Sequence, residues 1–300
     1  MIEKRGLLLV FLTAIISGFS IFINKFSVSG INSDIFTFSK NTVVAVFLFT
    51  VILSLGNFSE IKKLTKKQWL LLASIGLIGG SIPFLLFFRG LQLTSSAMGS
   101  LMHKTMFVYV GIFAVIFLKE KLSKKIIIPA LLLLIGNLIL LKINAFSFNY
   151  GDFLILIAAL FWAAENTLSK HILKELSGNI VAFGRMFFGS LFILAYLAAT
   201  KEIFLIKTMG VEQMTWIIVT SLILLGYVLT WYNGLKYVDV TLATSVLLLG
   251  SPITTLLNYL FLNAALTIND VVGGLFLLAG ISAMILVSKR IQSTTSTAYP

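Results

Sequence analysis

The stretch from Gly151 to His171, GDFLILIAALFWAAENTLSKH, is apolar and long enough to cross a lipid bilayer. It contains one glutamate, Glu165, well inside its apolar part. Because an ionised side chain inside a bilayer is costly, an ionisable residue in such a span indicates a functional site. We therefore interpret the stretch as a transmembrane helix and Glu165 as the first candidate site residue.

The first apolar stretch of the chain, residues 6–26, is the best internal match to this helix. When SGFSIFINK is aligned with WAAENTLSK, Lys25 falls on Lys170. In the same alignment Ser20 falls on Glu165. The match predicts that the chain contains two copies of one unit and that the second copy has acquired a charge.

The composition defines the class of protein. The chain is 58% hydrophobic and 11% charged, whereas soluble domains carry about 25% charged residues. These values exclude a soluble protein and predict an all-α polytopic membrane protein. There is no cysteine and there are two histidines, so we expect no disulfide, metal or cofactor. Phosphate-binding glycine loops and Ser/His/acid sets are also absent from the sequence, so we expect no enzyme.

Apolar stretches recur along the whole chain and predict ten transmembrane helices. Pro83 lies inside the third of them, where it should free a backbone carbonyl and bend the helix. The predicted spans are residues 6–26, 34–56, 69–89, 95–118, 126–141, 152–171, 180–200, 216–232, 242–262 and 271–287.

Lysine and arginine are distributed unevenly between the two sets of loops. Fifteen of the 23 lie at the ends that include both termini, five at the opposite ends and three inside spans. Cytoplasmic loops carry the excess of positive charge, so both termini should be cytoplasmic in a multi-pass protein of the cell membrane. The net charge of +12 is therefore ascribed to these loops and not to a nucleic-acid partner.

The internal repeat extends beyond the first helix. At a shift of 145 residues Lys40 meets Arg185, and at 144 Gly136 meets Gly280. Each copy has five helices, an odd number, so the copies should be inverted relative to each other. Inverted five-helix repeats are typical of secondary transporters, whose substrate site lies between the repeats. We expect repeats at 1–145 and 146–290, followed by a disordered cytoplasmic tail at 291–300.

Several motifs carry a resemblance to a known family. The first helix is rich in small residues and ends in Lys25, and FLKEKLS at 117–123 resembles the end of the family's fourth helix. GDF at 151–153, with ALFWA at 159–163, resembles the start of its sixth helix, and SP at 251–252 part of its ninth. Over nearly its whole length the chain resembles the EamA-type branch of the drug/metabolite transporter (DMT) superfamily.

The resemblance implies a ten-helix carrier of small metabolites, often amino acids and often moved outward. The sequence departs from the family pattern in four places. Lys119 replaces a glycine, residues 263–265 replace a second acidic ending, Lys40 replaces an arginine and Ser17 replaces a tryptophan. These departures leave the expected fold unchanged and leave the substrate open.

The predicted spans contain more positive than negative charge. Lys40, Lys104 and Arg185 lie inside them. Glu165 opposes these cations and should lie at the same depth as Arg185. This excess suggests a substrate with a carboxylate or another anionic group. For Lys104, near the middle of its helix, a cavity-lining role and a structural pair both remain open.

Two aromatic residues complete the candidate substrate-binding set. His103, beside Lys104, either contacts substrate or is a hydrogen-bonded packing residue. Trp162 either stacks on a substrate ring or anchors its helix at the interface.

A secondary transporter of a small molecule is the function that these observations favour. A membrane-embedded enzyme, and a channel or scaffold without carrier activity, are the alternatives. Glu165 is either the proton-coupling residue or half of a permanent pair with Arg185. The oligomeric state, monomer or homodimer, is left open.

The charge distribution generates a topology prediction. After Arg290, a fused reporter that works only in the cytoplasm should be active and one that works only in the periplasm should be inactive. The reason is that an even number of helices places both termini on one side. Paired phosphatase and fluorescent-protein fusions in cells measure this. A periplasmic reading would require an odd number of helices and would contradict the repeat.

Overall fold

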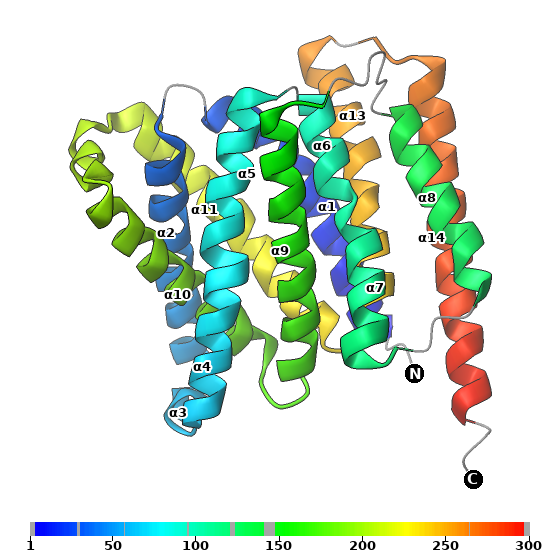
Figure 1. The fold of residues 1–300 in the computed structure, drawn as a ribbon, viewed down its shortest axis with the longest axis horizontal. Coiled ribbons are helices and arrows are strands. Elements are labelled where there is room, and N and C mark those ends of the chain that lie inside the picture. Colours follow the sequence, from blue (N-terminus) through cyan, green and yellow to red (C-terminus); the bar gives the residue numbers. More distant parts are fainter. Residues whose placement is uncertain are drawn as a thin grey trace.

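The computed structural model describes residues 4–28, 31–56, 58–94, 96–120, 124–140, 148–263 and 265–296. Within these ranges the regular structure is helical throughout (Figure 1). The prediction of an all-α fold is therefore confirmed for the described part of the chain.

The first half of the chain runs from α1 to α8. Its elements are α1 (Lys4–Ser27), α2 (Ser33–Ser54), α3 (Phe58–Lys62), α4 (Lys66–Ile75), η1 (Gly76–Ser81), α5 (Ile82–Leu93), α6 (Ser96–Lys104), α7 (Met106–Leu118), η2 (Lys124–Ile126) and α8 (Ile127–Leu140). The segments α4, η1 and α5 follow one another without a gap, as do α12, η4 and α13 in the second half.

The second half runs from α9 to α14. Its elements are α9 (Tyr150–Ile172), α10 (Gly178–Ala199), η3 (Glu202–Thr208), α11 (Val211–Leu235), α12 (Val240–Val246), η4 (Leu247–Leu249), α13 (Gly250–Leu262) and α14 (Ile268–Ser296). The tail predicted to be disordered from residue 291 overlaps the end of α14, and its last four residues lie outside the described ranges.

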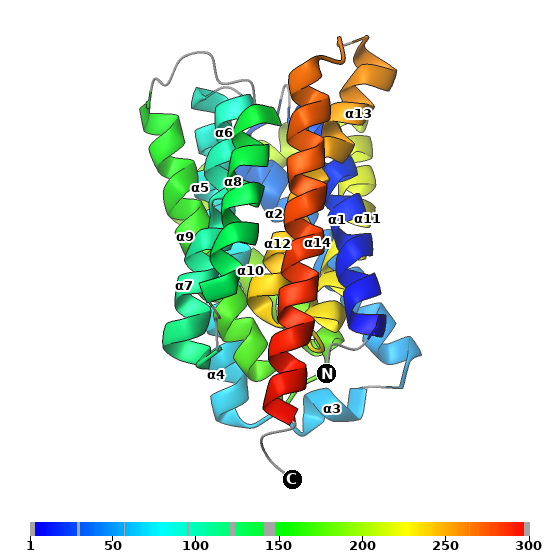
Figure 2. The ribbon, with the colours of Figure 1, turned by 90° about the vertical axis from the view of Figure 1, so that its right-hand side faces the viewer.

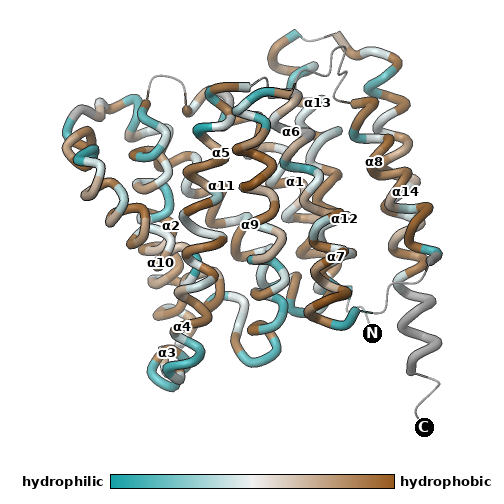
Figure 3. The backbone as a smooth tube through the Cα atoms, viewed as in Figure 1, coloured by the Kyte–Doolittle hydropathy of each residue, from teal (hydrophilic) through white to brown (hydrophobic). Residues whose placement is uncertain are grey.

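The described residues contain eight helices that are long and apolar enough to cross a membrane. Two shorter apolar helices, Met102–Leu118 and Ile127–Leu140, fall where the fourth and fifth spans are predicted. Hydrophilic residues gather in the turns at the two ends of the bundle (Figure 3). A band of apolar side chains between polar ends is the surface that a bilayer requires.

The helices of the two halves pack against each other reciprocally. In the first half α1 packs against α11 and α13, and in the second half α9 packs against α5 and α7. Other large contacts join α2 to α10 and α8 to α14, and α10 packs against η1 as α2 packs against α11. Exchanging the two halves leaves this set of contacts unchanged, as a two-fold relation between repeats requires. The two termini lie at the same end of the bundle (Figures 1 and 2).

Irregular turns interrupt three of the membrane helices. The third is α-helical in α4 and α5 but π-helical between them, from Gly76 to Ser81. The apolar stretches formed by α6 with α7 and by α12 with α13 are broken at positions related by the 144-residue shift, since α6 ends at Lys104 and η4 spans Leu247–Leu249. The eighth, α11, is continuous. Discontinuous helices at matching positions of two repeats are typical of transporter binding sites.

Glycines let the π-helical turn approach α10 closely. A Cβ atom added to Gly80 would lie 2.2 Å from the carbonyl oxygen of Arg185, and one added to Gly189 would lie 2.6 Å from the carbonyl oxygen of Gly80. The two backbones therefore touch here, and side chains larger than hydrogen are excluded on both sides.

This contact predicts that Gly80→Ala destabilises the protein by about 1–3 kcal/mol, because the added methyl group has to displace backbone and cannot displace a flexible side chain. Thermal unfolding of the purified protein in detergent measures the change. Gly274→Ala on α14 is the matched control, since nothing lies within 4 Å of a Cβ added there. Equal melting temperatures for the two variants would contradict the close packing.

Candidate functional site

The carbonyl oxygen of Gly79 is the meeting point of two predicted site residues. Pro83 has no N–H group, so it cannot donate the helical hydrogen bond that the Gly79 carbonyl would accept. Trp162 Nε1 and Arg185 Nη2 each donate to this oxygen at 3.0 Å. The expectation that Pro83 frees a carbonyl is confirmed, and the acceptor is used by α9 and α10.

A third helix also reaches the π-helical turn. Asn41 Nδ2 on α2 donates to the carbonyl oxygen of Gly80 at 2.8 Å, and its side chain is fully buried. The turn therefore accepts side-chain hydrogen bonds from α2, α9 and α10. These bonds replace backbone bonds that an α-helix would supply internally, as buried carbonyl groups require.

Glu165 is 1% exposed and lies against the same turn. Its Oε1 accepts hydrogen bonds from Ser169 Oγ at 2.6 Å and from the Tyr232 hydroxyl at 2.7 Å. A Cβ atom added to Gly79 would lie 2.2 Å from Glu165 Cγ, so the glycine makes room for the carboxylate.

The predicted Glu165–Arg185 pair is indirect. Among the described residues, Arg185 donates to Gly79 and Glu165 accepts from Ser169 and Tyr232, with no hydrogen bond joining the two charges. Arg185 still interacts electrostatically with both Tyr232 and Glu165. Tyr232 therefore contributes to this interaction. Nothing in the sequence distinguishes it from the other tyrosines of the chain.

Lys40 and Arg185 both lie over the ring of Phe84. The distance from the ring centroid is 5.9 Å to Lys40 Nζ and 5.4 Å to Arg185 Cζ. Lys40 Nζ also lies 4.9 Å from the rings of Phe36 and Phe88. These are cation–π distances, and the three phenylalanines form a cage around the ammonium group. Sequence reasoning missed this cage because phenylalanine is common throughout the chain.

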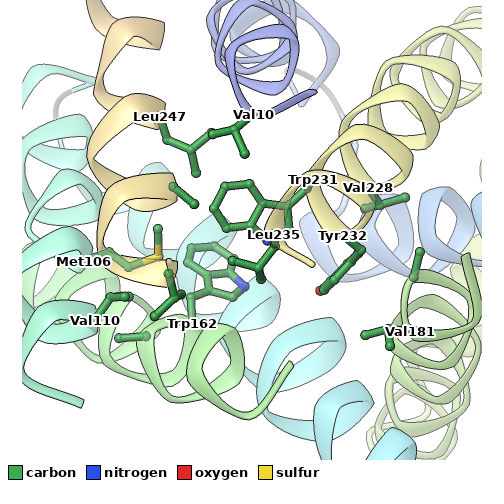
Figure 4. Packing of buried hydrophobic residues seen from close by; sticks show 14 of the residues in the cluster. Val10, Met106, Val110, Trp162, Val181, Val228, Trp231, Tyr232, Leu235 and Leu247 are labelled. Carbon is green, nitrogen blue, oxygen red and sulfur yellow. The ribbon is translucent and has the colours of Figure 1, made fainter. Parts of the chain in front are cut away.

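His103 and Trp162 come together through Phe87. The ring centroids are 5.1 Å apart for His103 and Trp162, and Phe87 lies 5.4 Å from His103 and 5.3 Å from Trp162. Figure 4 shows Trp162 beside Trp231 in the buried cluster. Trp162 is 6% exposed, so its packing is internal.

Lys104, at the end of α6, contacts the helix break of the second half of the chain. Its Nζ donates to the carbonyl oxygen of Leu247 at 3.5 Å, where α12 gives way to η4. The structure thus groups Lys40, Arg185, Glu165 and Trp162 around η1 and α5, with His103 at the edge of the group. Lys104 joins the two broken helices.

Two charged side chains hold the α11–α12 turn at the end of the bundle that carries the termini. Lys170 Nζ donates to the carbonyl oxygens of Leu235, Lys236 and Val238 at 2.7, 3.2 and 2.7 Å. Glu120 Oε1 accepts from the Val240 N–H at 3.0 Å. Burial, together with the nearby charge of Asp239, raises the pKa of Glu120. The two contacts connect this turn to α9 and to the end of α7.

The apolar helix bundle, its reciprocal halves and its buried charged cluster define the class as a polytopic membrane transporter. The model of the EamA-like transporter family matches residues 4–142 and again residues 149–286. The chain therefore belongs to the EamA-like transporter family, and the resemblance to the DMT superfamily is confirmed.

Relatives and a solved structure agree with this membership. An uncharacterised transporter of Archaeoglobus fulgidus is 25% identical over 84% of this chain and 88% of its own length. Another, in the cobO 3′ region of Sinorhizobium sp., is 33% identical over 33% of this chain and 70% of its own length. One crystal structure superposes with a TM-score of 0.78 at 18% identity, over 96% of this chain and 99% of the other. That last likeness shows the fold alone.

The bond from Tyr232 to Glu165 generates a stability prediction. Tyr232→Phe removes one of the two donors to a buried carboxylate and should destabilise the protein by about 1.5–3 kcal/mol. Thermal unfolding in detergent measures the loss. Tyr259→Phe, at a site that is 48% exposed, is the control and should leave the melting temperature unchanged. A Tyr232→Phe variant as stable as the control would show that this bond contributes nothing.

Proposed function

We propose that the protein is a secondary transporter that moves a small carboxylate-bearing metabolite across the cell membrane by alternating access. In this proposal ten helices cross the bilayer as two inverted five-helix repeats, and both termini are cytoplasmic. The observation that carries the proposal is the buried, positively charged cluster where helices of the two family-matched halves meet.

The charge balance supports an anionic substrate. Lys40, Lys104 and Arg185 are 3%, 5% and 5% exposed. Among the described residues, Glu165 is the buried acid that lies away from a helix end, whereas the buried Asp34, Asp152 and Asp270 lie in the first turns of their helices. A membrane interior does not tolerate uncompensated charge, so an excess of cations favours a ligand that brings the missing negative charge. Amino acids and other carboxylates fit this requirement, and the family resemblance favours export.

Glu165 is the proposed proton-coupling residue. A carrier whose sequence holds no phosphate-binding glycine loop draws on an ion gradient or on exchange. Glu165 can gain or lose a proton, and Tyr232 and Ser169 hold it beside the cluster. Its protonation would change the charge at the junction of α9, α10 and η1 and so favour one of the two access states. The alternative is that Glu165 keeps a permanent charge and only stabilises the junction of the three elements.

Two other function classes make different predictions. A membrane-embedded enzyme would convert its substrate without net movement, and a channel would conduct without saturation. Purified protein in liposomes, tested for counterflow with a panel of labelled amino acids and monocarboxylates, separates them. Saturable counterflow supports the carrier, whereas product formation or non-saturable flux would overturn it.

The coupling hypothesis generates a transport prediction. Glu165→Gln keeps the size of the side chain and removes the proton site, so it should abolish accumulation driven by a pH gradient and spare exchange of the counterflow substrate. Uptake by proteoliposomes with and without a pH gradient measures both. Glu212→Gln, at an exposed residue in the first turn of α11, is the control. Normal pH-driven accumulation by Glu165→Gln would end the coupling hypothesis.

A further inference from the structure

Lys40 and Arg185 occupy equivalent positions in the two repeats but have different surroundings. Arg185 has a backbone acceptor in the Gly79 carbonyl, at 3.0 Å. It also interacts with Glu165 and with Tyr232, which donates a hydrogen bond to Glu165. Arg185 therefore has a carbonyl acceptor, a carboxylate and a hydroxyl group of the protein close to it, although its Nε has no hydrogen-bond partner among the described residues.

Each of these three groups is missing at the equivalent position around Lys40. The repeat shift of 145 replaces Glu165 by Ser20, and the shift of 144 replaces Tyr232 by Phe88. The shift of 144 also places Tyr227 where the other copy has Pro83, and α11 runs through this position without a break. The positions equivalent to Glu165, Tyr232 and Pro83 around Lys40 therefore hold a serine, a phenylalanine and a tyrosine instead.

The contacts of Lys40 agree with this comparison. Its side chain is 3% exposed, and its Nζ donates no hydrogen bond to any described residue. Only the rings of Phe36, Phe84 and Phe88 are recorded around the ammonium group. Cation–π contacts contribute roughly 0.5–2 kcal/mol each. An aromatic ring supplies no oxygen acceptor, so a partner that does would stabilise the ammonium group further.

Ser20 lies on the inward face of its helix. It is one turn beyond Ser17 and two turns beyond Thr13, which are 8% and 0% exposed. In the second copy the corresponding position directs the Glu165 carboxylate towards the cluster that contains Arg185. In the first copy the same position holds Ser20, which brings no charge and whose Oγ accepts a hydrogen bond from Asn24 Nδ2 at 3.2 Å.

We propose that the carboxylate of the transported compound binds Lys40, beside Ser20, in the place that the repeat relation makes equivalent to that of the Glu165 carboxylate. Arg185 then has a carbonyl acceptor and a nearby carboxylate within the protein, and Lys40 is the cation left for the substrate. The inference rests on the proposed function for the identity of its ligand. Its test measures stability and binding alone. A protein that does not transport would therefore contradict the proposed function without deciding this inference.

The decisive variant supplies the missing anion covalently. Ser20→Glu should place a carboxylate near Lys40 and raise the melting temperature above that of wild type, whereas Ser20→Gln, of the same size and without charge, should not. In Ser20→Glu combined with Lys40→Gln the stabilisation should disappear, because the tethered carboxylate has lost its partner.

Acetate is the probe for the free site, because it presents the anionic group without the rest of a substrate. At several hundred millimolar, acetate should raise the melting temperature of wild type above that in equimolar gluconate by roughly 2 °C or more. The rise should be lost in Lys40→Gln and in Ser20→Glu, where the site lacks its cation or is already filled. Lys207→Gln, at an exposed lysine, removes the same charge and should keep the response.

Two results would overturn the proposal. One is a Ser20→Glu protein no more stable than Ser20→Gln. The other is an acetate response in Lys40→Gln equal to that of wild type. If Lys40→Gln fails to fold, Lys40→Met, which keeps the length and the apolar stem, replaces it in both comparisons. If neither Lys40 variant folds and acetate does not raise the melting temperature of wild type, that result would also count against the site.

Discussion

The arrangement of the site depends on one backbone oxygen, the Gly79 carbonyl that Pro83 leaves without its helical donor. A buried carbonyl has to accept a hydrogen bond, and here Trp162 and Arg185 supply it from two helices of the other repeat. The glycines of the same turn allow α9 and α10 to approach closely enough for these bonds. Through this oxygen a local rule about proline determines where a buried positive charge lies.

The two repeats solve the problem of a buried cation differently. In the second repeat, Arg185 has acceptors from its own protein within reach. In the first, Lys40 has aromatic rings and no hydrogen-bond acceptor among the described residues. A duplicated fold supplies equivalent positions, and substitutions at a few of them, such as Ser20 opposite Glu165, give the two buried cations different surroundings.

Much of the architecture could be predicted before any coordinates, because composition and the length of apolar runs are properties of single segments. The membrane class and the helical fold follow from them, the family follows from the resemblance of several motifs, and the role of Pro83 follows from its missing N–H group. The break at Leu247–Leu249 lies one turn before Pro252 and has the same local cause, whereas no proline follows Lys104 within a turn, so the break there has no such signal. Phe84, Phe88 and Tyr232 could not be selected either, because each resembles many other aromatic residues of the chain.

By itself the sequence determined that this is a two-copy helical membrane protein of the EamA-like family with charged residues in its spans. Only the tertiary structure decided which of those charges meet. Arg185 reaches a carbonyl of α4–η1–α5 instead of Glu165, and Lys104 reaches the broken ninth helix. The physical reason is that hydrophobicity acts on each segment separately, whereas hydrogen bonds and cation–π contacts depend on how helices far apart in the chain are packed together.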